Sequence, residues 1–289
     1  MIILYAALLN DKLVLAVAEA QLIKQHAKKI PQPQYFCPKC YQEVQLVTKV
    51  NQPYFKHFAQ NNKSLGEKAE HAQSKRLLQC GLVAAGFKTA SQEISLAQGR
   101  LRADVLANSQ LAFEVQCAPL SSREFAHRHA LYQQIKICDV WIVGKRHFLK
   151  HKIKKSQLIY FRKNQLWHDY YLEVDPSQEI LRLKYNILLE PLVNELHYQT
   201  QEFRLTAQGL QALWQFSPEL KHYKVDQVRQ KNYLQNQLNQ KTKVGLEIAT
   251  QLYQQRLTVA DLPTWVFHDF RQVTADNNIT KYLKSIVND

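Results

Sequence analysis

One aspartate and one glutamate stand where two short strands and a turn could bring their carboxylates together. The stretch is 100–116, with Asp104 in its first half and Glu114 in its second. Two carboxylates on one face can bind a divalent cation such as Mg²⁺ or Mn²⁺. A cation held in this way lowers the pKa of a bound water and neutralises charge on a phosphate. We therefore predict metal-assisted phosphodiester hydrolysis at this stretch.

The alternation of apolar and polar residues restricts how the two strands can pair. The apolar residues are Leu101, Ala103 and Val105 in the first strand, and Leu111, Phe113 and Val115 in the second. Because side chains alternate with period two, both sets share a face only when paired residue numbers sum to an even value. Asp104 opposite Glu114, across a loop at 108–110, is such a register. It also places Gln116 on the polar face with the two acids.

The elements around this hairpin predict a compact α/β domain. An apolar stripe ended by Gly86 indicates a helix before the hairpin, and a capping box from Ser121 to Glu124 opens a helix after it. A nearly all-apolar run after that helix is typical of a buried central strand. The predicted order is helix (67–85), strand (93–96), two hairpin strands, helix (121–135) and strand (139–144).

The N-terminal region predicts a small β module of the zinc-finger kind over residues 1–62. Cys37 and Cys40 form a Cys-x-x-Cys knuckle, and His57 follows between predicted strands at 44–50 and 54–58. Two thiolates and a histidine suit a tetrahedral Zn²⁺ site. Gln60 stands where a fourth ligand would complete the set, so either a zinc site or a metal-free knuckle fits the pattern. Strands are also expected at 2–9 and 13–18.

The overall composition favours a polyanionic partner in a reducing compartment. The formal net charge of +14 fits nucleic acid, with an anionic membrane surface as the weaker alternative. Five cysteines, of which only one pair is close in sequence, argue against a disulfide framework. The apolar start carries no basic lead and is broken by Asn10, so we expect neither a signal peptide nor a membrane span. A cytoplasmic protein is the expectation.

The second half of the chain is basic and then helical in character. Lys152, Lys154 and Lys155 belong to a dense basic run, and aromatic and basic residues alternate over 158–172. Such interleaving suits single-stranded DNA, although a solvated face and an aromatic core give the same pattern. From Glu190 the sequence is glutamine-rich and predicted to be mainly helical. We expect domains at 1–62, 63–150 and 151–289, the last either gripping DNA or supporting the fold.

The site resembles the glutamine-bearing variant of the PD-(D/E)xK nuclease superfamily, and the whole chain resembles the competence protein CoiA family. The usual motif has a lysine two residues after the glutamate, where this chain has Gln116. The resemblance implies a restriction-endonuclease-like core. The matching residues are, in order, 36–40, 54–59, Glu70 with His71 and Lys75, 102–105, 114–116, Arg128 and Tyr132.

The resemblance also implies a function and a role for each matching residue. It implies a protein that acts on incoming DNA during natural transformation and promotes its recombination, with single-stranded or branched DNA and recombination proteins as partners. Asp104 and Glu114 become ligands of Mg²⁺ or Mn²⁺, Gln116 the substitute for lysine and Glu70 an auxiliary acid. The implied DNA contacts are His71, Lys75, Arg102 and Arg128. A DNA-binding recombination mediator that cuts nothing is the alternative, because Gln116 is neutral, and a zinc-knuckle RNA-binding protein is a weaker one.

Overall fold

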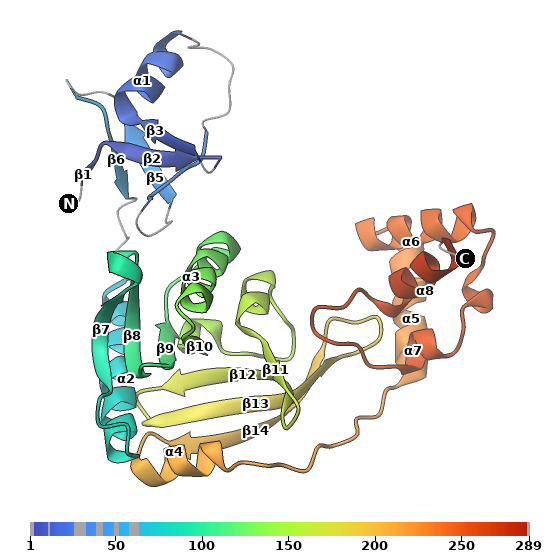
Figure 1. Ribbon diagram of the computed structural model, residues 1–289. Helices are drawn as coiled ribbons and strands as arrows, with labels where there is room; N and C mark the ends of the chain where they lie inside the picture. The colour runs from blue at the N-terminus through green and yellow to red at the C-terminus, as the bar shows by residue number, and fades with distance from the viewer. Residues whose placement is uncertain are drawn as a thin grey trace. The chain divides into compact units, whose positions relative to one another are not determined.

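The protein is a mixed α/β chain that divides into two compact units, Met1–Trp141 and Ile142–Asp289 (Figure 1). The computed structural model describes residues 3–10, 12–25, 33–38, 43–48, 52–57 and 64–287. The expected α/β class is confirmed at this level. The division falls inside strand β10 (Cys138–Val143), whereas the sequence places domain boundaries after residues 62 and 150; those boundaries stay predictions.

The first unit begins with a small sheet and a helix. The strands are β1 (Ile3–Leu4), β2 (Ala6–Leu9), β3 (Lys12–Leu15), β4 (Tyr35–Phe36), β5 (Glu43–Val47) and β6 (Tyr54–His57), in the order β1-β6-β5-β4-β2-β3. Helix α1 (Ala16–Gln25) follows β3 directly, so the strand predicted to reach residue 18 ends early. Three alanines at 16, 18 and 20 favour the helix. Its buried residues Ala16, Glu19 and Ala20 lie on one face.

The candidate hairpin and its flanking elements occupy the rest of the first unit. They are α2 (Ser64–Ala84), β7 (Ser91–Leu96), η1 (Ala97–Gly99), β8 (Leu101–Asn108), β9 (Leu111–Gln116), α3 (Ser122–Gln134) and β10. This is the predicted order of elements. Helix α2 begins at Ser64, three residues before the helix predicted from residue 67. The strands run β7-β8-β9, the start of β10 lies beside β9, and α2 packs on β7, β8 and β9 (Figure 1).

The register of β8 and β9 is the predicted one. Val105 pairs with Phe113 and Leu106 with Ala112, so paired numbers sum to an even value and Asp104 comes opposite Glu114. The pairing shifts before Asn108, which pairs with Leu111. The connection is therefore a two-residue turn after an irregularity, and not the three-residue loop of the prediction. The polar face is covered, because β9 is buried at four successive residues, 112–115.

The second unit is a sheet followed by helices. After η2 (Lys145–His147) and η3 (Lys155–Tyr160), β11 (Arg162–Asn164) pairs with β12 (His168–Asp175). β12, β13 (Ile180–Leu189) and β14 (Leu196–Arg204) then run antiparallel, side by side in Figure 1. The prediction of helix from Glu190 is wrong for β14. That strand is rich in glutamine and glutamate, and its pairing with the apolar β13 overrides weak strand propensity.

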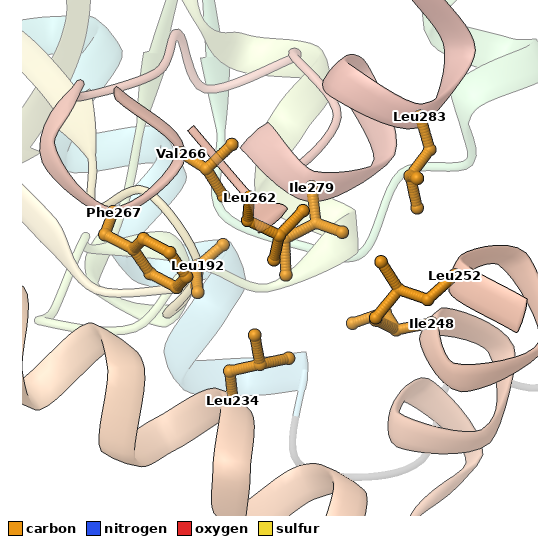
Figure 2. Close-up of a cluster of buried hydrophobic side chains, with 9 residues drawn as sticks. All are labelled: Leu192, Leu234, Ile248, Leu252, Leu262, Val266, Phe267, Ile279 and Leu283. Atoms are coloured by element: carbon orange, nitrogen blue, oxygen red, sulfur yellow. The ribbon is translucent and has the colours of Figure 1, made fainter. Parts of the chain in front are cut away.

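The C-terminal helices, from residue 227 on, have a core of their own (Figure 2), whereas the helix before them packs on β14. The elements are α4 (Ala207–Trp214), α5 (Gln227–Asn239), α6 (Lys243–Gln254), η4 (Val259–Asp261), α7 (Trp265–His268) and α8 (Asn278–Val287). The buried cluster consists of Leu192, Leu234, Ile248, Leu252, Leu262, Val266, Phe267, Ile279 and Leu283. In the described part of the chain, no helix is both long and apolar enough to cross a membrane.

Candidate active site

Glu114, on β9, is fully buried and held by two residues of α3. Its Oε1 accepts a hydrogen bond from the Tyr132 hydroxyl, and its Oε2 accepts one from the Arg128 guanidinium. Burial raises the pKa of Glu114 most, Arg128 and Tyr132 oppose the shift and the charge of Asp104 adds to it, and the resulting pKa is about 8. In the metal-free protein at neutral pH, Glu114 is therefore mostly protonated.

Asp104, on β8, has the opposite electrostatic surroundings. Its Oδ2 accepts the Val115 amide at 2.9 Å and lies 3.1 Å from His71 Nε2, and its Oδ1 lies 4.0 Å from Lys75 Nζ. Burial pushes its pKa up. The His71 hydrogen bond and charge, with Arg128 and the Val115 amide, outweigh burial and lower the pKa overall. Two neighbouring carboxylates whose pKa values are moved apart are typical of catalytic sites.

The two helices that supply these contacts are positioned by local sequence signals. The Ser121 hydroxyl caps α3 by accepting the Glu124 amide at 3.1 Å, as its capping box predicts. Arg128 and Tyr132 are four positions apart on α3, so their side chains lie on one face of the helix and reach the same carboxylate. The same spacing joins His71 to Lys75 on α2, and both approach Asp104. The DNA contacts that the family resemblance implies for His71 and Lys75 stay predictions.

A third acid, Glu93 of β7, lies in one row with Asp104 and Glu114, and the sequence-based prediction did not include it. Gln92 pairs with Val105 and Ile94 with Ala103, so Glu93 falls opposite Asp104. It binds the Lys75 ammonium, and its Oε2 lies 2.7 Å from Arg102 Nε. Adjacent strands thus present Glu93, Asp104 and Glu114 in one row. The alternation of β7 could have indicated this, because Glu93 has the parity that faces Asp104.

Two other residues predicted for the site, Gln116 and Glu70, have surroundings that differ from each other. The Gln116 side-chain amide donates to the Ala118 carbonyl at 2.7 Å, so it is tied to the backbone just beyond its own strand. Glu70 is partly buried on α2, next to His71. The roles predicted for them, a lysine substitute and an auxiliary acid, stay predictions.

The donor set suits a divalent cation, although part of it is engaged. Asp104 and Glu114 provide carboxylate oxygens, and Mg²⁺ typically uses one or two carboxylates while keeping several waters. Arg128 and Tyr132 each donate to one oxygen of Glu114, so a cation would have to displace or share the position of at least one of them. Within the described residues, no group of three or more His, Cys, Asp or Glu side chains is arranged to hold a metal ion.

The predicted zinc ligands are described only in part. Cys37 is buried in the core of the small sheet with Tyr35 and Phe55. Cys40 and Gln60 lie outside the described residues, and so does the side chain of His57, whose backbone ends β6. Zinc binding stays a prediction.

The predicted basic surface lies in the second unit. Lys152, Lys154 and Lys155 are all exposed there. Part of the interleaved aromatic pattern is inside, because Tyr160 and Tyr171 are fully buried and Tyr171 donates to the His147 carbonyl at 2.9 Å, whereas Phe161, Trp167 and Tyr170 are partly exposed. The aromatic alternation therefore belongs to the core at these two buried tyrosines, while DNA binding by the lysines stays a prediction. Arg102 in the first unit is also largely exposed, at 71% of its side chain.

Comparison with protein families gives one match. The model described as "Competence protein CoiA, nuclease-like domain" matches residues 67–218, a little over half of the chain. The match begins within α2 and covers every described residue discussed above for the Asp104–Glu114 site. Comparisons with curated proteins and with solved structures find no match.

Proposed function

Because this chain belongs to the competence protein CoiA family, we propose that its nuclease-like domain hydrolyses phosphodiester bonds in incoming DNA during natural transformation. The substrate is single-stranded or branched DNA in the cytoplasm, and the cleavage promotes recombination. One observation carries this proposal: Asp104 and Glu114 lie side by side on paired strands with pKa values moved in opposite directions. An ion pair between Arg128 and Glu114 that served stability alone would not need a second carboxylate, that of Asp104, beside the buried one.

Each residue of the site has a task in this chemistry. Asp104 and Glu114 would hold Mg²⁺ or Mn²⁺, which when bound activates water and neutralises the phosphate. Asp104 is kept ionised by His71 and the Val115 amide, so it is ready to bind a cation. Glu114 gives up its proton and its contact with Arg128, and the freed guanidinium can then meet a phosphate oxygen. Arg102, exposed at the rim, adds a further contact to the DNA backbone.

The test is a cleavage assay with Mg²⁺ and with Mn²⁺ on single-stranded, duplex and branched DNA. The wild type should cut at least one form, and Asp104→Asn should cut it at least about a thousandfold more slowly while binding DNA nearly as well. Asp175→Asn is the control, because Asp175 also lies on a strand and accepts hydrogen bonds, here from Ser177. Cleavage by Asp104→Asn at the wild-type rate would overturn the proposal.

A recombination mediator that binds DNA without cutting it is the second candidate. Two observations favour it: both oxygens of Glu114 are engaged by protein groups, and Gln116 is neutral and bound to backbone. This function predicts DNA binding that is the same with and without divalent metal, and no products from any DNA form. Asp104→Asn would then leave strand annealing or exchange unchanged.

For the N-terminal module we propose a structural Zn²⁺ held by Cys37, Cys40 and His57. The support is the Cys-x-x-Cys spacing and the place of Cys37 in the small core. Metal analysis of the purified protein should give close to one zinc per chain, and Cys37→Ser should lose it. Cys117→Ser, another buried cysteine, is the control and should keep it. Absence of zinc from the wild-type protein would contradict this proposal and show that the knuckle is metal-free.

A further inference from the structure

A buried lysine lies between two of the three carboxylates in the row. The Lys75 side chain is only 9% exposed, it binds Glu93, and its Nζ lies 4.0 Å from Asp104 Oδ1. Burying an ammonium requires desolvation and the ordering of a long side chain, so a lysine that served only solubility would not lie here. Its position is next to the carboxylate that we propose as a metal ligand, where a scissile phosphate would have to come.

Gln116, two residues after Glu114 on its strand, stands where a lysine could supply a positive charge, and it supplies none. Gln116 lies on β9 with the parity of Glu114, but its amide is neutral and donates to the Ala118 carbonyl at 2.7 Å. A hydrogen-bonded amide can neither balance the charge that grows on a phosphate in the transition state nor reach it without breaking that bond. A positive charge on the Oδ1 side of Asp104 comes instead from helix α2, through Lys75.

We infer that Lys75 is the catalytic cation of this site in place of Gln116, and that Glu93 is the positioning residue that holds it. The inference rests on the proposed nuclease function and names a residue for it. The Lys75 ammonium donates hydrogen bonds to a non-bridging phosphate oxygen. Meanwhile a water oxygen forms a bond to phosphorus and loses a proton to solvent, and the bond to the leaving sugar oxygen, which takes up a proton, breaks.

Two further observations at the same place support this role. Glu93 has a left-handed backbone conformation, φ +58°, which is uncommon for a residue with a side chain, and such strain gathers at functional sites. In the part of the chain that the structure describes, the Ser74 hydroxyl is fully buried and has no hydrogen-bond partner. It is the neighbour of Lys75 on α2. A buried hydroxyl in this state is available to an ordered water beside Lys75.

The test removes the positive charge at residue 75, places one at residue 116, and measures the rate of DNA cleavage after each change. Lys75→Met should lower the cleavage rate constant about 100-fold, the usual cost of removing one transition-state hydrogen-bond donor. DNA affinity should change less than about threefold, and Mn²⁺ binding measured by calorimetry should be unchanged. Adding Gln116→Lys to Lys75→Met should restore the rate at least about tenfold. Lys68→Met removes an exposed charge from the same helix and should have no effect.

The outcomes separate this inference from the proposed function. Cleavage by Lys75→Met within about threefold of wild type, with Asp104→Asn inactive, would overturn the role of Lys75 and leave the nuclease intact. Activity in Asp104→Asn would overturn the nuclease proposal itself. Thermal melts establish folding; if Lys75→Met does not fold, Glu93→Gln replaces it, with an expected tenfold loss of rate at unchanged DNA affinity. An unchanged rate in folded Glu93→Gln would overturn the positioning role.

Discussion

Each unit of the molecule contains a fully buried glutamate on a strand, and their partners differ in kind. In the second unit, Glu173 binds Lys184 at 2.9 Å and Arg182 at 3.3 Å, and it accepts the Leu149 amide at 2.7 Å. In the first unit, Glu114 binds one cation and a hydroxyl, and it lies beside a second carboxylate, Asp104.

The difference shows which of the two carboxylates is arranged for stability. Two cations and an amide satisfy Glu173 completely, as a buried structural charge requires. The surroundings of Glu114 raise its pKa to about 8, so the folded protein disfavours the ionised form. Surroundings that disfavour the ionised form of Glu114 do not stabilise the fold through its charge. It indicates a site that becomes fully favourable only when a further positive charge arrives.

Exchanging each glutamate for the amide of the same shape should separate stability from chemistry, with the largest effect at Glu173. Glu173→Gln leaves Lys184 buried without its counterion, and the free energy of unfolding should fall by about 3 kcal/mol. Glu114→Gln should not lower it at pH 7 and should raise it, because the neutral amide removes the proton that the folded protein must take up there while the unfolded chain is ionised. Urea titrations of both variants measure this, and a loss of stability in Glu114→Gln would contradict the comparison.

The pH dependence of stability should show the same contrast with a smaller effect. The folded-state pKa of Glu114 is raised from 4.5 to about 8, so over this window the unfolded chain releases a proton that the folded protein keeps. Stability must therefore fall as pH rises, by about 2 kcal/mol between pH 6 and 7.5 in metal-free protein. Comparison of wild type with Glu114→Gln isolates this term. The slopes should differ; equal slopes would show that the pKa of Glu114 is ordinary.

The smallest effect concerns the helix caps of the two units. Ser121 caps α3, which bears Arg128 and Tyr132, and Thr242 caps α6 in the second unit. Replacing either by alanine should lower the free energy of unfolding by about 1 kcal/mol. Only Ser121→Ala should also slow DNA cleavage, because only α3 contacts Glu114. Equal cleavage rates in the two variants would mean that the start of α3 does not position the site.

Local patterns in the sequence predicted the frame of the candidate site. Period-two alternation gave the parity of the pairing between β8 and β9, because only one parity buries both apolar faces, and the observed pairing of Val105 with Phe113 has that parity. The capping box at Ser121 gave the start of α3. The pair Asp104 and Glu114 could therefore be located from the sequence alone.

The contacts that complete the site could not be predicted in the same way. Lys75 and Glu93 are eighteen residues apart and meet only because α2 packs on β7, a tertiary fact with no local signal. The hold of Arg128 and Tyr132 on Glu114 is similar: their spacing was visible, but their partner was not. In the second unit, β14 escaped prediction because its polar sequence is a strand only beside β13.

A calorimetric titration with Mn²⁺ tests most directly whether the Asp104–Glu114 pair is a metal-binding active site. It should be run near pH 8.5, where Glu114 is largely ionised and a cation need not compete with its proton. We expect wild type to bind Mn²⁺ at this site, Glu173→Gln to bind it equally, and Glu114→Gln to lose it. Equal Mn²⁺ binding by Glu114→Gln and wild type would contradict the assignment of Glu114 as a metal ligand.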